Sequence, residues 1–466
     1  MKTGKLRVRK LSSWKTAGAV FLVCAATAIA SPAQTFATLV NFDGTDGANP
    51  EAGLVQATNG NFYGTTYDGG ANGQGTVFKI TLGGKLIILH SFETTDGALP
   101  AAGLVQAPSG DFYGTTYLGG ANGDGTVFKI TGGGALTTLH SFDDSADGGY
   151  PLGGLVQATS GDFYGTTFAG GSNGQGTVFK ITGGGKLTKL YNFCSKPECK
   201  DGIGPSAALV QATNDNFYGT TSGGGANGQG TVFKITGGGK LTTLHSFGTD
   251  GADPEAGLVQ ATDGDFYGAT YFGGANGDGT IFKITSKGML TTVHSFDGTD
   301  GANPEAGLVQ ATDGDFYGTT NLGGANGDGT IFKITSKGML TTVHSFDFTD
   351  GSGPVGGLVQ ATNGKLYGTT INGGADGEGT IFRLSVGLGP FVETRPTSGK
   401  VGAAVIILGN NLKGATSVTF NGTGAIFTAS NTEITTTVPS GATTGFVKVT
   451  TPKRTLKSNV VFRVTK

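Results

Sequence analysis

Cysteine, tryptophan and long apolar runs are scarce in this sequence, and each shortage argues against a class of protein. The 466 residues include 3 Cys and 1 Trp. Only Cys194 and Cys199 lie beyond residue 30; they are too few for a zinc site and wrongly spaced for a Cys-x-x-Cys redox motif. No later apolar run is long enough to span a bilayer. We therefore expect no membrane span in the mature chain, and a local disulfide between Cys194 and Cys199.

Proline is scarce as well, and glycine is abundant without the collagen pattern. The chain has 14 Pro and 88 Gly with no Gly-X-Y period, which excludes collagen. Disorder is disfavoured because 30 Phe and 12 Tyr recur at fixed intervals beside β-branched residues. Ordered glycine at this density implies many tight turns, which is typical of a repetitive all-β protein.

The N-terminal 30 residues predict a secretory signal peptide. A basic start is followed by an apolar run over residues 17–30, which ends in a small-x-small cleavage pattern. The run is shorter than the roughly 20 residues that a membrane-spanning helix needs. We therefore expect an exported protein that is then secreted, held at the cell surface or kept in the periplasm.

Charge is distributed unevenly along the chain. Residues 35–386 carry 16 Lys or Arg against 31 Asp or Glu, whereas residues 387–466 carry 9 against 2. The acidic body argues against a nucleic-acid partner and suits cations or neutral ligands. The basic C-terminal part could contact an anionic surface or polymer, but scattered solvated lysines would give the same charge.

Seven tandem repeats fill residues 35–386. The phrase Leu-Val-Gln-Ala recurs at intervals of 49 to 54 residues, starting at Leu54, Leu104, Leu155, Leu209, Leu258, Leu308 and Leu358. Each full repeat holds four short, β-branched or aromatic segments separated by Gly, Asp and Asn turns. Four antiparallel strands per roughly 50 residues form the unit of a β-propeller blade.

The two ends of the repeat array complement each other. The seventh repeat lacks the fourth segment, and the missing copy stands at residues 36–42, before the first repeat. A closed ring explains this, because the N-terminal strand would complete the last blade and leave no exposed sheet edge. The sequence therefore predicts a seven-bladed β-propeller over residues 35–386. Alternating runs over residues 391–466 predict a small β-sandwich.

Four recurring phrases resemble a known repeat family. Leu-Val-Gln-Ala, Phe-Tyr-Gly-Thr-Thr, Gly-Gly-x-x-Gly-x-Gly-Thr-x-Phe and Leu-x-x-Leu-His-x-Phe recur in order over residues 36–386, as in the GloVer tandem repeat of bacterial exported proteins. Residues 396–402, 406–412, 418–422 and 438–439 resemble an IPT/TIG immunoglobulin-like domain. Neither resemblance implies a defined reaction or a required cofactor.

One set of candidate ligands comes from the loop between repeats, which carries Asp-Gly-x-x-Pro in every copy. Carboxylates and glycine carbonyls there could hold Ca²⁺, which prefers oxygen ligands. The alternative is that each Asp caps its own turn, and sevenfold repetition favours this structural role. The candidate metal ligands are Asp46, Asp96, Asp147, Asp250, Asp300 and Asp350.

A second candidate set lies where the repeats differ. The residue after the Thr-Thr or Ala-Thr step is aromatic in four repeats, and exposed aromatic rings there could stack on sugars or receive a peptide. Packing between blades is the alternative, and the position of Trp14, the only Trp, within the signal segment weakens the carbohydrate interpretation. These candidate ligand-binding residues are Tyr67, Tyr117, Phe168 and Tyr271.

We therefore expect an exported, non-catalytic binding protein for an extracellular glycan or protein. The first alternative is an extracellular lyase or hydrolase that acts on polysaccharide, and the second is a purely structural protein of the cell envelope. Catalysis is the less favoured interpretation because the sequence shows no acidic pair that is clearly confined to one or two repeats.

Overall fold

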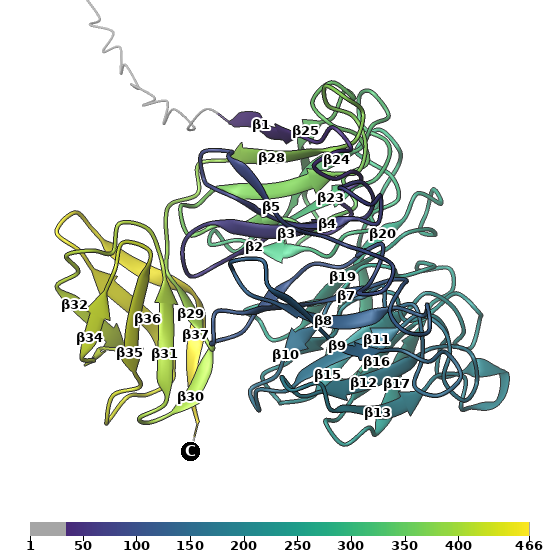
Figure 1. Cartoon of the computed structure of the whole chain (residues 1–466), viewed down its shortest axis with the longest axis horizontal. Helices are drawn as coiled ribbons and strands as arrows, with labels where there is room; N and C mark the ends of the chain where they lie inside the picture. The colour runs from purple at the N-terminus through teal and green to yellow at the C-terminus, as the bar shows by residue number, and fades with distance from the viewer. Residues whose placement is uncertain (1–33, 466) are drawn as a thin grey trace, which may run out of the picture.

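The structure, a computed structural model, describes residues 34–465 and is all-β (Figure 1). Its only helical element within that range is a 3-10 turn, η1 (Pro197–Cys199). No helix among these residues is long and apolar enough to cross a membrane. The predicted signal peptide lies outside the described residues.

Residues 35–385 form seven four-stranded antiparallel sheets in a propeller-like arrangement. The first strands are β2 (Val55–Gln56), β6 (Val105–Gln106), β10 (Val156–Gln157), β14 (Val210–Gln211), β18 (Val259–Gln260), β22 (Val309–Gln310) and β26 (Val359–Gln360). The second strands are β3 (Phe62–Thr66), β7 (Phe112–Thr116), β11 (Phe163–Thr167), β15 (Phe217–Thr221), β19 (Phe266–Thr270), β23 (Phe316–Thr320) and β27 (Leu366–Thr370). The third strands are β4 (Thr76–Ile80), β8 (Thr126–Ile130), β12 (Thr177–Ile181), β16 (Thr231–Ile235), β20 (Thr280–Ile284), β24 (Thr330–Ile334) and β28 (Thr380–Ser385).

The fourth strand of the last sheet comes from the start of the chain. In six sheets the fourth strand follows the third, as β5 (Leu86–Ser91), β9 (Leu136–Ser141), β13 (Leu187–Asn192), β17 (Leu241–Ser246), β21 (Leu290–Ser295) and β25 (Leu340–Ser345). In the seventh, β1 (Thr35–Asn41) pairs antiparallel with β28, so the strand order is β1-β28-β27-β26. The N-terminal strand thus occupies the place of the segment that the seventh repeat lacks.

The seven first strands lie side by side and close on themselves. A Cβ added to Gly103 would lie 3.0 Å from the carbonyl oxygen of Gly53, and one added to Gly53 would lie 2.6 Å from that of Gly357. The first repeat therefore touches the last. The Gln of Leu-Val-Gln-Ala ties the same junction, because the Thr362 N–H donates to Gln56 Oε1 at 2.9 Å. Five of the other six junctions repeat this bond.

Aromatic stacking joins each sheet to the next. The Tyr of one Phe-Tyr-Gly phrase packs on the Phe of the following phrase, with ring centroids 4.0 to 4.3 Å apart at six of the seven junctions. At the seventh junction Leu366 stands in place of Phe and packs in the same cluster as Tyr317. Most of the ring's core therefore lies between sheets, where Phe, Tyr, Val and Ile are buried.

Residues 391–465 form a separate pair of sheets, the C-terminal module (green-yellow to yellow in Figure 1). One sheet has the order β29 (Glu393–Arg395), β31 (Ala404–Leu408), β35 (Glu433–Thr437) and β34 (Phe427–Ala429). The other has the order β30 (Ser398–Lys400), β37 (Thr455–Thr465), β36 (Gly445–Thr450), β32 (Ser417–Phe420) and β33 (Thr423–Gly424). Alternating apolar side chains from both sheets bury one core, which includes Ile407, Val418 and Phe462.

Phe42 directly follows β1, so replacing it tests how much the stability of the ring depends on its closure. Its side chain is fully buried and packs on Phe78 of the first repeat, with ring centroids 5.5 Å apart. We expect Phe42→Ala to lower the free energy of unfolding by about 3–5 kcal/mol, because it leaves a cavity at the closing junction. Phe272→Ala is the matched control, since Phe272 is 49% exposed. Equal losses in urea denaturation of the two variants would contradict this role of Phe42.

Candidate functional site

The first strands enclose a central channel with a volume of about 900 Å³. The C-terminal module covers one end of it, because β29 and the residues after it line the channel there. Arg395 reaches into the ring, where Nη2 donates to the Gln56 carbonyl oxygen at 2.9 Å and Nη1 donates to Gln106 Oε1 at 3.3 Å. Its Nε bonds Glu393 Oε1 at 2.8 Å, which fixes the guanidinium group. The covered end of the channel is therefore polar.

Further contacts hold the module against this end of the ring. The Arg463 guanidinium bonds Asp215 Oδ1 at 2.9 Å and also reaches the carbonyl oxygen of Thr213. Asn410 Nδ2 donates to Thr362 Oγ1 at 2.6 Å, and the Phe391 N–H donates to the Thr362 carbonyl oxygen at 3.1 Å. The module thus contacts hairpins of the fourth and seventh repeats as well as the first two.

Three glutamates line the other end of the channel. Glu51, Glu255 and Glu305 each follow the proline of the loop between repeats and precede a first strand. All three are partly buried. The same position holds other residues in the remaining repeats, namely Ala101, Leu152, Ser206 and Val355. The carboxylates therefore belong to the fifth, sixth and first repeats, and the seventh repeat, which lies between the sixth and the first, has Val355 at this position.

Burial and the repulsion of neighbouring carboxylates raise the pKa values of these carboxyl groups. Burial, together with smaller contributions from the charges of Glu305 and Asp68, raises the pKa of Glu51 to about 7. Burial also raises the pKa of Glu255 to about 7, with added repulsion from Glu305 and Asp253. The pKa of Glu305 is raised by burial too, although a hydrogen bond from Asn321 Nδ2 to its carboxylate at 3.3 Å opposes this. Such groups can donate as well as accept a proton near neutral pH.

The structure brings the predicted tyrosines near these carboxylates. The pKa of the Tyr67 phenol is raised first by burial and then by the charge of Glu51. The pKa of Tyr271 is raised by burial and then by Glu305 and Glu255. Tyr117 lies beside Tyr150, with ring centroids 5.5 Å apart, and both are partly buried. These tyrosines therefore surround the glutamate end of the channel without lining the channel itself.

Phe168, the fourth predicted aromatic, lies apart from the glutamates. Its side chain is 37% exposed, and a Cβ added to Gly204 would lie 3.0 Å from its ring, so it covers the neighbouring loop. The sequence interpretation missed the three glutamates and Tyr150. The signal that could have found them is the variation of the residue directly after the repeat proline, compared in the same way as the residue after Thr-Thr.

The predicted calcium ligands each have protein partners. The Oδ1 atom of Asp96 accepts the N–H of Glu93 at 2.9 Å, and the same cap recurs at the other five positions. In four of these residues Oδ2 accepts from a histidine of the preceding fourth strand at 2.7 to 2.9 Å. His245 approaches Asp250 at 2.8 Å outside hydrogen-bond geometry. Among residues 34–465 no three His, Cys, Asp or Glu side chains form a group that could hold a metal ion.

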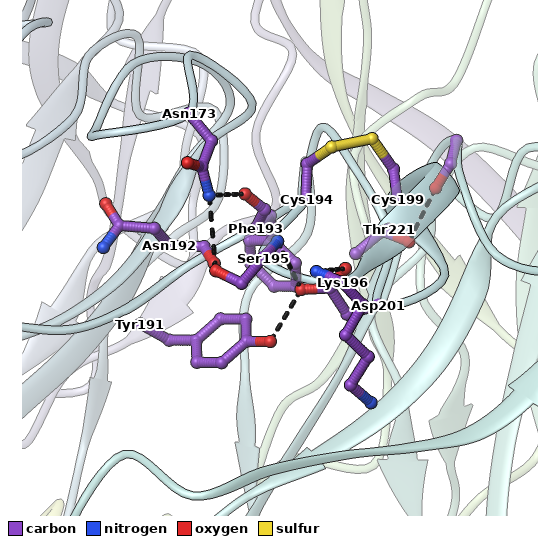
Figure 2. The surroundings of a disulfide bond; sticks show 11 residues. Asn173, Tyr191, Asn192, Phe193, Cys194, Ser195, Lys196, Cys199, Asp201 and Thr221 are labelled. Atoms are coloured by element: carbon purple, nitrogen blue, oxygen red, sulfur yellow. Dashed lines mark hydrogen bonds between the residues drawn. A yellow bond between two sulfur atoms is a disulfide. The ribbon is translucent and has the colours of Figure 1, made fainter.

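In the loop after β13, Cys194 and Cys199 form a disulfide (Figure 2). Asp201 holds the loop from within and is fully buried, unlike its counterparts in other repeats. Its carboxylate accepts from the Tyr191 hydroxyl at 2.6 Å and from the N–H groups of Ser195 and Lys196 at 2.9 and 3.1 Å. Tyr191 stands where five other fourth strands have histidine. The disulfide and the buried carboxylate thus fix one loop together.

The chain belongs to the Gloeobacter/Verrucomicrobia repeat family. The family pattern matches residues 12–214, 133–321 and 205–427, which together span most of the chain. No curated protein matches the chain.

Solved structures show the same overall fold at low sequence identity. A fungal alcohol oxidase of the AA5 family, in complex with copper, is 15% identical with a TM-score of 0.53, over 93% of this chain and 99% of the oxidase. The extracellular domain assigned to two-component system BT4673 of B. thetaiotaomicron is 10% identical with a TM-score of 0.50. That match covers 81% of this chain and 46% of the domain. A second structure of the BT4673 extracellular domain is 13% identical with a TM-score of 0.50, covering 93% of this chain and 58% of that one.

The raised pKa values predict how stability depends on pH. A carboxyl group with an ordinary pKa of 4.5 in the unfolded chain and about 7 in the fold stabilises the fold fully below pH 4.5, and this contribution is lost as pH rises through 7. We expect Glu51→Gln plus Glu255→Gln to stabilise the fold more at pH 8 than at pH 4. The gain in the free energy of unfolding should be larger at pH 8 by about 2 kcal/mol per replaced residue. Urea denaturation between pH 4 and 8 measures this. The exposed pair Glu93→Gln and Glu198→Gln is the control, and a pH-independent difference for the buried pair would contradict the raised pKa values.

The buried carboxylate of the disulfide loop gives a second prediction. We expect Asp201→Ala to lower the free energy of unfolding by about 2–4 kcal/mol, since it leaves the part-buried Tyr191 hydroxyl and two N–H groups without their acceptor. Asp250→Ala, at the same position of the next repeat, is the control and is expected to cost about 1 kcal/mol because the Asp250 side chain is 33% exposed. Equal costs in urea denaturation would show that burial of Asp201 is unimportant.

Proposed function

We propose that this protein is an exported binding protein whose ligand enters the glutamate end of the central channel. In this proposal residues 35–386 form a seven-bladed β-propeller and residues 391–466 form an IPT/TIG immunoglobulin-like β-sandwich. Membership of the repeat family and the extracellular domains among the structures of similar fold support export. Residues 1–30 act as the signal peptide that directs it.

One observation carries the proposal. The channel has a volume of about 900 Å³, the C-terminal module covers one end, and the three glutamates line the other. A cavity of this size with a few placed polar groups is typical of a ligand site. Burying three like charges together destabilises the fold, so a role in binding accounts for residues that the ring itself does not need.

The side chains favour a neutral, hydroxyl-rich ligand such as the end of a glycan. Carboxylates accept hydrogen bonds from sugar hydroxyl groups, and the phenol rings of Tyr67 and Tyr271 offer apolar faces and polar edges. The acidic body of 31 Asp or Glu against 16 Lys or Arg repels anionic ligands from this end. Tyr117, whose charge acts on Tyr67, extends the same aromatic surface, whereas Phe168 covers the loop at Gly204. Calcium at the six loop carboxylates remains a prediction that binding assays with and without Ca²⁺ test.

A second candidate function, acid–base catalysis on a polysaccharide, is favoured by one specific observation. Two carboxyl groups, Glu51 and Glu255, have pKa values of about 7 in the same channel. General acids and bases work best with pKa values near the operating pH. A lyase or hydrolase would use such a pair, and product analysis separates it from a binding protein.

The test is a screen of neutral oligosaccharides and peptides against the mature chain, with every hit analysed for breakdown products. We expect saturable binding without products, weakened at least tenfold by Tyr67→Ala plus Tyr271→Ala, because each ring removed costs about 1 kcal/mol or more of contact. Phe348→Ala is the control, since Phe348 is 50% exposed in the loop after β25.

The screen separates the alternatives. Products that disappear in Glu51→Gln or Glu255→Gln would establish the enzyme. Absence of any saturable ligand would contradict both candidate functions and leave a structural role in the cell envelope. Binding that the tyrosine variants do not weaken would place the ligand elsewhere on the protein.

A further inference from the structure

A second cavity, with a volume of about 510 Å³, lies between the ring and the C-terminal module. The ring contributes Asn363, and the module contributes the rest of the lining discussed below. Three basic side chains line it, Lys413, Lys453 and Arg454. They lie in two turns of the module, one after β31 and one between β36 and β37. The cavity is therefore separate from the channel and of opposite charge.

No carboxylate neutralises these three side chains. Among the described residues, none of the three has an Asp or Glu oxygen within 4 Å, whereas Arg395 and Arg463 of the same module are both ion-paired. Between residues 391 and 465 the sequence holds only two carboxylates, Glu393 and Glu433, and neither lines the cavity. The positive charge of the cavity is thus available to an outside anion.

The backbone that carries these cations is well fixed. Thr451 and Arg454 close their turn with hydrogen bonds in both directions, from the Thr451 N–H to the Arg454 carbonyl oxygen at 2.8 Å and from the Arg454 N–H to Thr451 Oγ1 at 3.2 Å. Leu412, next to Lys413, donates its N–H to the Asn431 carbonyl oxygen at 3.0 Å. The turns are therefore held in place before any ligand binds.

Amide side chains accompany the cations. Asn410, Asn411 and Asn431 line the same cavity, and Asn411 and Asn431 are exposed. Asn410 uses its Nδ2 to bond Thr362 of the ring, which leaves its Oδ1 to accept a hydrogen bond. An amide both donates to and accepts from hydroxyl groups, whereas a guanidinium group binds a carboxylate through two parallel hydrogen bonds. The lining therefore matches a ligand that has both hydroxyl groups and an acidic group.

We propose that this cavity binds an acidic sugar unit of an extracellular polysaccharide. Arg454 takes the carboxylate, Lys413 and Lys453 add charge, and the asparagine amides bond the ring hydroxyl groups. A cavity of about 510 Å³ suits one or two sugar units. The site is independent of the channel, because the glutamates there repel the same ligand.

The experiment measures binding of an oligogalacturonate probe to the full mature chain by titration calorimetry at low salt. We expect saturable binding that weakens at least tenfold in Lys413→Gln plus Lys453→Gln and that falls as salt rises. The matched control is Lys400→Gln plus Lys448→Gln, which removes the same charge from exposed positions of the module outside the cavity. We expect the control to change affinity less than threefold.

Two more comparisons sharpen the test. Arg454→Lys keeps the charge but loses the paired hydrogen bonds, so we expect it to weaken binding about threefold to tenfold. The cavity variants should not change the affinity for a neutral oligogalactose of equal length. All replaced side chains are exposed, and thermal denaturation of each variant checks that the fold is retained.

Three outcomes would overturn the proposal. Equal losses in the cavity and control pairs would show a general charge attraction instead of a site. Binding of inorganic phosphate or of anionic lipid vesicles that depends on Lys413 and Lys453, without oligogalacturonate binding, would assign the cavity to a different anion. Unchanged oligogalacturonate affinity in the cavity variants would place the acidic ligand elsewhere.

Discussion

The stacking of a tyrosine in one sheet on a phenylalanine in the next is the interaction on which the rest of the ring depends. Tyr63 on Phe112, with ring centroids 4.0 Å apart, is one of six such pairs, and another, Tyr367 on Phe62, joins the last sheet to the first. Each sheet buries its faces only against its neighbours, so no sheet has a complete core alone. The stacking repeats at six of the seven junctions, and Leu366 packs in the cluster of Tyr317 at the other, so one geometry fixes the angle between sheets and hence the closure of the ring.

Closure determines where chemistry can occur. The first strands lie so close together that a Cβ at Gly53 would approach the carbonyl oxygen of Gly357 to 2.6 Å, which excludes a side chain at that position. The residue after the repeat proline lies at the end of the central channel, where it makes no sheet contact. Glutamate is therefore tolerated there, and burial of Glu51 and Glu255 raises their pKa values. The C-terminal module covers the opposite end through Arg395.

Much of the fold followed from local patterns, and little of the site did. The four phrases of each repeat predicted the strands of its sheet, and the unmatched segment at residues 36–42 predicted the pairing of β1 with β28. Only the structure showed that Asp96 and its counterparts cap their turns and also accept from a histidine. His90 lies on the fourth strand and Asp96 in the loop after it, and the sequence does not show how that loop turns back toward the strand. The meeting of Glu51 with Glu305 could not be seen in the sequence, since 254 residues separate them and only ring closure makes them neighbours.

The sequence alone determined the all-β class, the repeat number and the place of the joining strand, because alternation of side chains and turn residues act over a few positions. The tertiary structure alone decided which of the variable residues face one another. It placed Tyr67 by Glu51, brought Arg395 under Gln56 and left Lys413 and Arg454 without acidic partners. Such contacts join residues far apart in the chain, and their geometry depends on the angle between packed sheets instead of on any local preference.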